Sequence, residues 1–246
     1  MMSDAGKSAK ARTLLVVGAH SADFVWRAAG AIAVMTSNGG KAMVVALSYG
    51  ERGESGELWK EPGQTVENVK RIRHAEASRA AEALGATFVC FDLGDYPLNV
   101  DNDALARLTE LIRETTPNVM VTHTEKDPFN PDHPVAYAAT QRARLLASGA
   151  GVESGFQTVQ PPELFLFEPH QPEQCDFVPT IFVDITAVFP LKQQAMEAMA
   201  AQQYLRQYYT EQAEHRANHA RRVSGLKDIR YAEAFQRVLP QVVTTL

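Results

Sequence analysis

The sequence predicts an α/β protein with a Rossmann-like, doubly wound, mostly parallel sheet and helices on both of its faces. The first reason is that short, continuous apolar runs, such as the one from Leu14 to Gly18, have the length and composition of strands buried on both sides. The second is that these runs alternate with longer segments of helical character, as β-α-β units require. In such folds ligands bind beyond the carboxyl ends of the strands, so the segments after strands should carry function.

The predicted elements follow one another with few interruptions. Residues 1–12 are polar, and we expect them to form a flexible tail before a single α/β domain over residues 13–246. A strand over 14–18 leads into a largely apolar helix over 24–37, which ends at Asn38-Gly39-Gly40, a sequence suited to a C-cap and turn. The later elements are, in order, strand 42–48, a loop rich in Gly and Glu over 49–65, helix 66–84, strand 87–92, helix 103–115, strand 118–122, helix 134–148, strands 163–167 and 180–185, and one or two long helices over 191–217.

Composition argues against several classes of function. The 246 residues are 45% hydrophobic and 22% charged, which is ordinary for a globular protein. The net charge of −5 offers no general basic face for phosphates, so nucleic acid is not an expected partner. No apolar run suits a membrane span or a signal peptide, and Cys90 and Cys175 form no CxxC motif. We therefore expect a cytoplasmic protein without a disulfide framework.

The long helical segment near the carboxyl end leaves two questions open. Met196, Met199, Leu205 and the tyrosines between Gln203 and Thr210 form either core or a subunit contact, and we expect a homo-oligomer. His215 and His219 are spaced i, i+4, but the glutamate that follows the first histidine in zinc proteases is absent. We interpret this pair as a solvated helix face.

Polar, chemically capable residues gather after the predicted strands. His20, Glu51, His123 and Asp127 each follow one, so the fold should bring them to one rim of the sheet. His20 and Asp23 lie three residues apart at a strand-to-helix turn, a spacing that lets both reach one metal ion. Together with His133 they would form a site with open coordination positions, as catalytic metals have.

The two motifs around these ligands resemble those of the LmbE-like proteins, relatives of the PIG-L de-N-acetylases. Ala19-His20-Ser21-Ala22-Asp23-Phe24 stands where that family has Ala-His-Pro-Asp-Asp-Glu, and Asn130-Pro131-Asp132-His133 stands where it has His-Pro-Asp-His. The resemblance implies a Rossmann-like domain and a zinc ion, or another divalent ion, held by His20, Asp23 and His133. Further matches are Gly50-Glu51, Arg73 and Glu76 before Leu84-Gly85, Thr122-His123 with Asp127-Pro128, and Tyr231-Ala232-Glu233-Ala234-Phe235.

Two departures from the family pattern bear on the chemistry. In the deacetylases the middle acid of the first motif acts as the general base, and here that position is Ala22, which cannot accept a proton. A missing base typically costs about 10²–10⁴-fold in rate. Asn130 replaces a histidine and can form hydrogen bonds but cannot shuttle a proton near neutral pH.

The altered motifs resemble a divergent branch of the family, the 4-oxalomesaconate hydratases of gallate degradation. The resemblance extends to Gly50-Glu51-Arg52-Gly53-Glu54-Ser55 and to residues 167–175, which include His170. It implies a hydro-lyase of aromatic catabolism that adds water to the double bond of a tricarboxylic 2-oxo acid. We expect Glu54 and His170 to move the protons, with the division between base and acid left open.

A substrate with three carboxylates needs cationic partners. Arg52 and Arg73 are preferred, and the other candidates are Arg27, Lys126, Arg221 and Arg222. Three further residues are expected near the substrate: Asn130, His123, which could instead support the metal ligands, and Glu51, which could instead orient its loop.

Two other functions remain open at this point. One is a zinc-dependent N-deacetylase of an N-acetylated sugar or related amide, in which another acid has replaced the lost base. The other is a catalytically inactive metal-binding protein. Ala22 counts against the first of these, and the retained His20, Asp23 and His133 count against the second.

Overall fold

A seven-stranded sheet in the order β3-β2-β1-β4-β5-β7-β6 forms the centre of the computed structural model, which describes residues 12–243. Strands β1 to β5 pair in parallel, whereas β7 runs antiparallel to both of its neighbours. The strands are β1 (Thr13–Gly18), β2 (Lys41–Ala46), β3 (Thr87–Cys90), β4 (Val119–Thr122), β5 (Glu163–Phe167), β6 (Ile181–Asp184) and β7 (Ala232–Arg237). The α/β class and the mostly parallel sheet predicted from the sequence are confirmed.

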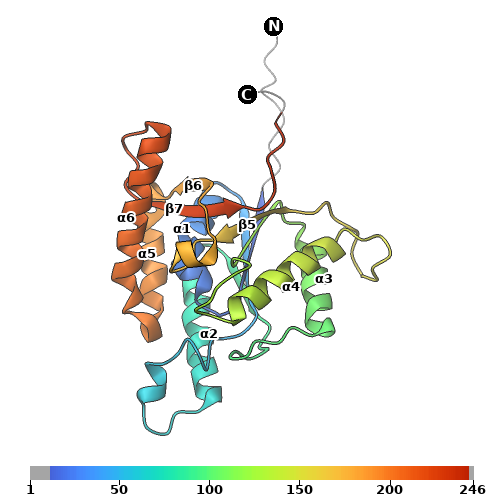
Figure 1. Cartoon of the computed structure of the whole chain (residues 1–246). Helices are drawn as coiled ribbons and strands as arrows, with labels where there is room; N and C mark the ends of the chain where they lie inside the picture. The colour runs from blue at the N-terminus through green and yellow to red at the C-terminus, as the bar shows by residue number, and fades with distance from the viewer. Residues whose placement is uncertain (1–11, 244–246) are drawn as a thin grey trace.

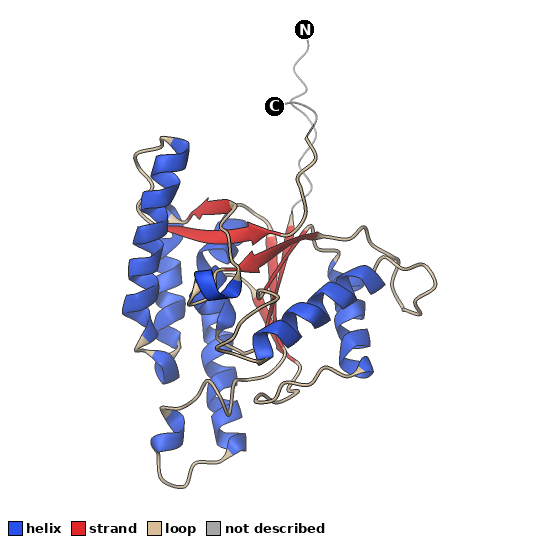
Figure 2. Ribbon diagram, viewed as in Figure 1, coloured by secondary structure: helices blue, strands red, loops and turns tan. Residues whose placement is uncertain are grey.

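Helices cover both faces of this sheet (Figures 1 and 2). One layer contains α1 (Asp23–Ser37), α2 (Val66–Ala83), α5 (Phe189–Ala198) and α6 (Leu205–Ser224), and the other contains α3 (Asn102–Thr115) and α4 (Asp132–Leu146). Four short 3₁₀ helices lie in the connections: η1 (Leu58–Lys60), η2 (Pro172–Cys175), η3 (Thr186–Val188) and η4 (Ala200–Gln202). None of the helices in the described part of the chain has the length and apolar character needed to cross a membrane.

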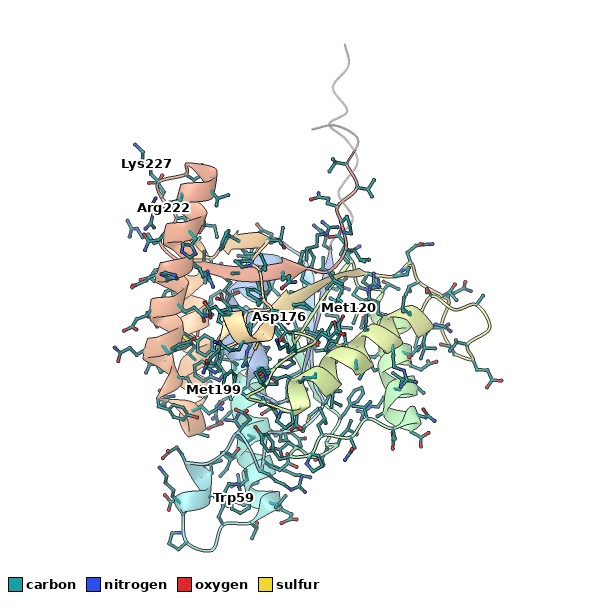
Figure 3. All side chains as sticks on the ribbon, in the orientation of Figure 1. Trp59, Met120, Asp176, Met199, Arg222 and Lys227 are labelled. Carbon is teal, nitrogen blue, oxygen red and sulfur yellow. The ribbon has the colours of Figure 1, made fainter. Side chains whose placement is uncertain are left out.

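The apolar strands feed two separate hydrophobic cores. Leu14 and Val16 of β1 point into the core beneath α1, α2 and α5, and the alternating residues Leu15 and Val17 point into the core beneath α3 and α4. Met120 lies at the sheet, fully buried in the second core (Figure 3). Each such side chain contributes roughly 1.5–3 kcal/mol by leaving water, which explains why these strands are continuous apolar runs.

The chain changes direction across the sheet between β1 and β4. From β1 it winds outward through β2 to β3, and it then returns to place β4 on the other side of β1. The crevice beyond the carboxyl ends of β1 and β4 is therefore a topological switch point, where ligands bind in open α/β sheets. The fold thus brings together the segments that begin at residues 19 and 123.

Two features differ from the sequence prediction or resolve it. Strand β7 was not predicted, because its sequence AEAFQR interrupts the apolar pattern with Glu233, which is buried in an ion pair with Lys192 (2.6 Å). The predicted helix 191–217 is two helices separated by η4. Met196 and Met199 belong to the core, whereas Tyr204 is exposed.

Residues 1–11 of the expected tail lie outside the described residues, as do 244–246.

Candidate active site

A cavity of about 140 Å³ opens at the predicted rim of the sheet. Its walls come from the turn after β1, the loop after β2, the segment between β4 and α4, the segment after β5, and the start of α6. The lining residues with polar or charged side chains include His20, Asp23, Arg27, Glu54, Tyr96, Asp127, Asn130, His133, His170, Gln171 and Gln202. The elements that supply them are far apart in sequence, and only the sheet brings them together.

His20, Asp23 and His133 form a buried cluster in this cavity. One ligand atom from each lies within 4.8 Å of the other two, a spacing that could hold a metal ion. His20 lies in the turn after β1, Asp23 is the first residue of α1, and His133 is in the first turn of α4. The expectation that these three residues meet is therefore met by the geometry.

The unpaired atoms of the cluster fit a metal ion. Nδ1 of His20 and Nε2 of His133 are buried and have no hydrogen-bond partner among the described residues. The other nitrogen of each ring is held by a carboxylate: His20 Nε2 lies 3.1 Å from Asp132 Oδ2, and His133 Nδ1 lies 2.7 Å from Asp127 Oδ2. Metal-binding histidines are oriented in this way, because the carboxylate fixes the ring and makes the free nitrogen more basic.

Asp23 is fixed from several directions. Its Oδ2 accepts a hydrogen bond from the backbone N–H of His20 (2.7 Å) and lies 3.0 Å from His123 Nε2, and its Oδ1 accepts from Arg27 Nη1 (2.7 Å). Burial alone would raise the pKa of this carboxyl, but the positive and hydrogen-bonding groups around it hold the pKa well below its usual value. Asp23 is therefore ionised, the state that a metal ligand requires.

The two histidines of the cluster have opposite pKa shifts. Burial, followed by the neighbouring His123, holds the pKa of His133 well below its usual value, so its ring is neutral and the Nε2 lone pair is free. Burial also opposes a charge on His20, but hydrogen bonds to Asp132 and Asp23 raise its pKa to about 10. Surroundings that favour a proton at His20 also favour a metal cation there.

A second acidic group, His20 with Asp95 and Asp132, has a structural explanation. Asp132 accepts hydrogen bonds from the backbone N–H groups of Tyr96 (3.0 Å) and Leu98 (2.8 Å). Asp95 accepts from those of Arg52 (2.9 Å) and Gly53 (2.6 Å). These carboxylates are satisfied by the loops that they anchor, so their role is to position His20 and the loop after β2.

Glu54 brings a carboxylate to the cavity from that loop. Its Oε1 lies 3.9 Å from the free Nδ1 of His20 and accepts a hydrogen bond from Asn130 Nδ2 (2.8 Å), and its Oε2 accepts from Gln202 Nε2 (3.1 Å). The methyl group of Ala22 lines the same cavity. An acid from a different loop therefore lies beside the ligand cluster, in a site where position 22 has none.

The loop conformation that delivers Glu54 depends on a glycine. A Cβ at Gly53 would overlap the ring of Tyr96, so no other residue fits between Arg52 and Glu54 without moving that ring. Gly50, with φ of +70°, adopts the left-handed conformation that glycine favours and precedes the turn. The Gly- and Glu-rich sequence is thus a folded loop rather than a flexible one.

His170 lies at the edge of the cavity after β5. The residue is exposed, but its ring packs beside Tyr209, whose hydroxyl lies 3.3 Å from His170 Nε2. Partial burial and the positive charge of Arg27 lower the pKa of His170, so it is neutral at neutral pH. The sequence-predicted pair Glu54 and His170 therefore lines one cavity with the ligand cluster.

The structure places the other expected substrate-binding residues differently. Asn130 lines the cavity, whereas His123 lies behind the cluster, stacked on His133 at 3.9 Å between ring centres. Arg52, Arg73 and Glu51 do not line it. Arg73 is fully buried against Glu76 Oε2 (2.9 Å) and Gln202 Oε1 (3.0 Å).

Glu51 and Arg52 are paired within their own loop. Glu51 is fully buried, and burial raises its pKa, while Arg52 Nη1 donates to the carbonyl of Asp95 (2.9 Å). The geometry instead assigns the cationic wall of the cavity to Arg27.

Sequence reasoning missed Gln202. It placed Asp127 at the rim of the sheet without giving it a role, and it gave none to Asp132. Asp127 and Asp132 lie within or beside the second motif, so their positions next to His133 were a usable signal. Gln202 lies 148 residues from its partner Glu54. It has no local signal, because only the packing of α5 and α6 onto α1 and α2 brings it to the cavity.

Comparisons with known proteins show the family of the chain. The sequence profile of the GlcNAc-PI de-N-acetylase (PIG-L) family matches residues 15–144. The chain is 46% identical over 238 residues to a 4-oxalmesaconate hydratase of Pseudomonas putida KT2440, covering 96% of this chain and 92% of that protein. It is 27% identical to a 1D-myo-inositol 2-acetamido-2-deoxy-alpha-D-glucopyranoside deacetylase of Rhodococcus jostii RHA1, covering 78% and 82%.

A solved structure gives the same picture. The crystal structure of GalB, described as the 4-carboxy-2-hydroxymuconate hydratase of Pseudomonas putida KT2440, superposes with a TM-score of 0.93 at 46% identity. The superposition covers 96% of this chain and 99% of that one. The likeness therefore extends over the whole sheet, both helical layers and the loops around the cavity.

Proposed function

Because the chain belongs to the GlcNAc-PI de-N-acetylase (PIG-L) family and resembles its hydratases most strongly among the relatives compared, we propose that it is a metal-dependent 4-oxalomesaconate hydratase. This hydro-lyase adds water across the carbon–carbon double bond of 4-oxalomesaconate and yields 4-carboxy-4-hydroxy-2-oxoadipate. The reaction belongs to the catabolism of gallate and related aromatic acids.

One observation carries the proposal. The acid beside the ligand cluster is Glu54, which comes from the loop after β2, and not a residue of the first motif, where Ala22 stands. A base in a deacetylase must serve a water that attacks an amide carbonyl, whereas a hydratase needs its base over an alkene. In this chain the acid stands at position 54 and not at position 22, while the three candidate metal ligands are kept. This arrangement fits a base that acts over an alkene, as a hydratase needs.

The metal would supply electrostatic stabilisation. When bound by His20, Asp23 and His133, a divalent ion, for which zinc is our first choice, would polarise the 2-oxo acid and stabilise negative charge on its enolate. The cavity lining carries three carboxylates, Asp23, Glu54 and Asp127, against the single guanidinium of Arg27. A polyanionic substrate would be repelled by that balance, so a divalent cation also makes substrate binding electrostatically feasible.

Glu54 is suited to take a proton from the attacking water. Hydrogen bonds from Asn130 and Gln202 hold both of its oxygens in place at the cavity wall. As the water oxygen bonds to one alkene carbon, one water proton passes to Glu54, and the other alkene carbon receives a proton through His170. The proton on Glu54 is then released to solvent, and solvent returns one to His170, so both residues end as they began. The sum is the addition of one water molecule, with no bond of the carbon skeleton broken.

His170 is suited to handle the second proton. It is neutral at neutral pH, so one ring nitrogen carries a proton and the other can accept one. Tyr209, whose own pKa is raised by burial, keeps its hydroxyl proton and provides a hydrogen-bond partner at Nε2. We assign His170 to the carbon-bound or enol proton of the substrate, and Glu54 to the water.

The setting of the reaction follows from the same proposal. Both cysteines are free thiols, which fits a reducing cytoplasm, where we place the enzyme. We also propose a homo-oligomer, with the exposed rings of Tyr204 and Tyr208 among its contact residues. Sedimentation of the purified protein tests this, and a monomer at micromolar concentration would contradict it.

Two parallel assays test the function. Metal-loaded protein is incubated with 4-oxalomesaconate while the absorbance of the conjugated system is followed, and with N-acetylglucosamine derivatives while free amine is followed. We expect the chromophore to disappear and no amine to form. A chelator should abolish the reaction, and zinc should restore it.

The same assays decide between the alternatives. Amine release without alkene hydration would overturn the proposal in favour of an N-deacetylase, with Glu54 as its replacement base. Zinc binding without either reaction would indicate an inactive metal-binding protein. The arrangement of Glu54, Asn130 and Gln202 favours an active enzyme, because a carboxylate held by two amides beside the ligand cluster serves no evident structural purpose.

A further inference from the structure

Arg27 has the position and the free donors to select the charge of the substrate. We infer that Arg27 binds a carboxylate that the metal ligands do not hold, and that it makes the cavity specific for di- and tricarboxylic 2-oxo acids over monocarboxylic ones. This inference rests on the proposed function. It adds a specificity residue to a site whose ligands and proton-transfer groups are described above.

The first support is where Arg27 lies. It is one helical turn beyond Asp23 on α1, only 8% exposed, and it lines the cavity together with the ligand cluster and His170. It is the one lining residue among those described that carries a permanent positive charge. A carboxylate entering the cavity therefore finds one guanidinium, held on a buried helix.

The second support is that most of its hydrogen-bonding capacity is unused. A guanidinium has five N–H donors, and the described structure gives Arg27 one partner, Asp23 Oδ1 at 2.7 Å from Nη1. Its Nε is buried and has no partner among residues 12–243. A buried donor without a partner costs roughly 1–3 kcal/mol. A bound carboxylate, which accepts two parallel N–H bonds from arginine, would satisfy these donors.

The third support is that other basic side chains are committed elsewhere. Arg73 is fully buried in its pair with Glu76. The side chain of Arg52 is 49% exposed and donates to the carbonyl of Asp95. Lys126 is 57% exposed and pairs with Asp176 (3.1 Å). None of the three lines the cavity.

The test compares two ligands that differ in one carboxylate. 2-Oxoglutarate and 2-oxopentanoate share the 2-oxo acid end and a five-carbon chain, but only the first has a distal carboxylate. Their dissociation constants are measured by calorimetry on the metal-loaded parent, on Arg27→Gln and on Arg27→Lys. We expect the parent to prefer 2-oxoglutarate by about 10- to 100-fold, the range of one charge-assisted hydrogen-bonded contact.

The preference ratio is the decisive number. Arg27→Gln should reduce it to within about threefold of unity, while Arg27→Lys should keep part of it. A purely structural role of Arg27 toward Asp23 would weaken both ligands equally and leave the ratio unchanged. Arg142→Gln, at an exposed position of α4, is the matched control and should keep the parental ratio.

The outcomes separate this inference from the proposed function. A ratio near unity in the parent, or an unchanged ratio in folded Arg27→Gln, overturns the inference whatever the turnover. Loss of the ratio in Arg27→Gln supports it, even if 4-oxalomesaconate is not hydrated and the proposed function fails. If neither variant folds, a crystal structure of the parent with 2-oxoglutarate decides, since a carboxylate more than about 4 Å from the Arg27 guanidinium contradicts the inference.

Discussion

The cavity has two halves that are built in different ways. The half that we propose to hold the metal, called here the ligand half, consists of His20, Asp23 and His133; these residues follow a strand or lie in the first turns of helices, and each side chain is at most 5% exposed. The half that we propose to move protons, called here the proton-transfer half, consists of Glu54, whose side chain is 28% exposed, and the exposed His170, both on connecting segments. Ligand geometry is thus fixed by the sheet, whereas proton-transfer groups can be exchanged by changing loops.

This difference explains how one family can hold deacetylases and a hydratase. The ligand half needs the switch point between β1 and β4, which is set by the topology. The acid can move from position 22 to position 54 without disturbing those strands. A change in either half should therefore have a distinct signature, and the following predictions are arranged to separate them.

The largest effect is expected in the ligand half. His20→Ala removes the free Nδ1 and the ring that pairs with Asp132, so the protein should lose bound metal and turnover together. The loss of rate should be on the order of 10³-fold or more, since a metal contributes several kcal/mol to the transition state. Metal content by mass spectrometry and the alkene assay measure both.

The matched control for this prediction is His215→Ala, which removes a histidine from α6 that does not line the cavity. That variant should keep both metal and rate. Full activity with bound zinc in His20→Ala would show that the ligand assignment is wrong.

The next largest effect is expected in the proton-transfer half. Glu54→Gln keeps the size of the side chain but removes its basicity, so kcat should fall by about 10²–10⁴-fold while metal content stays at the parental level. Glu57→Gln alters a glutamate of the same loop that pairs with Lys60 (2.6 Å), and its rate should be unchanged. Loss of metal in Glu54→Gln would show that Glu54 also supports metal binding, which contradicts the separation of the two halves.

The two halves also differ in how far the sequence could predict them. His20, Asp23 and His133 follow apolar strands or begin helices, so periodicity and topology place them at one rim. Glu54 and His170 were found through motif resemblance, because loops carry no periodic signal. Gln202 could not be predicted, since its contact with Glu54 depends on how α5 and α6 pack onto α1 and α2.

The fold, like the site, could be predicted from the sequence only where the apolar pattern is regular. The five parallel strands were predicted because each contains a short apolar run, and those of β1, β2 and β4 are largely buried. Strand β7 was missed because Glu233 breaks its apolar pattern. The burial of Glu233 is explained by distant partners, which are Lys192, 41 residues away, and the backbone N–H groups of Gly30 and Ala31 on α1. Arg52 and Arg73 were preferred for the substrate carboxylates, but neither lines the cavity, since sequence position does not show which way a side chain points.

A smaller effect is expected where the halves meet. Asn130, in the segment that leads to α4, donates to Glu54, so Asn130→Ala should leave the carboxylate held by Gln202 alone. We expect kcat to fall by about 10-fold, within the range for one hydrogen bond to a charged group, with metal retained. Asn130→His, which restores the deacetylase residue, should not restore the rate; a parental rate in either variant would contradict the role.

The pKa of the His170 ring determines whether this residue is neutral at the pH of the reaction, and two measurements test it. Partial burial and Arg27 lower its pKa, while Asp127 and Asp23 raise it. A lowered folded-state pKa means that the unfolded chain binds the proton more readily, so the fold should lose stability as the pH falls from about 6.5 toward the lowered pKa. Arg27→Gln removes one positive charge and should move the His170 pKa upward, as NMR titration of its ring at constant metal content would show.

The smallest effect is expected outside both halves, at Arg52. Its side chain is half exposed and lies 3.5 Å from Glu51 Oε1 and 3.9 Å from Asp95 Oδ1, two buried carboxylates. Because the guanidinium is partly solvated, we expect each of these long contacts to contribute only about 1 kcal/mol. Arg52→Gln should therefore change kcat and KM by less than about fivefold, because the loop is held by the Arg52 backbone N–H on Asp95, which the substitution keeps. Steady-state kinetics with 4-oxalomesaconate measure this directly. A KM raised tenfold or more with kcat unchanged would instead make Arg52 a carboxylate-binding residue, and the boundary of the proton-transfer half would then extend to the outer edge of the loop after β2.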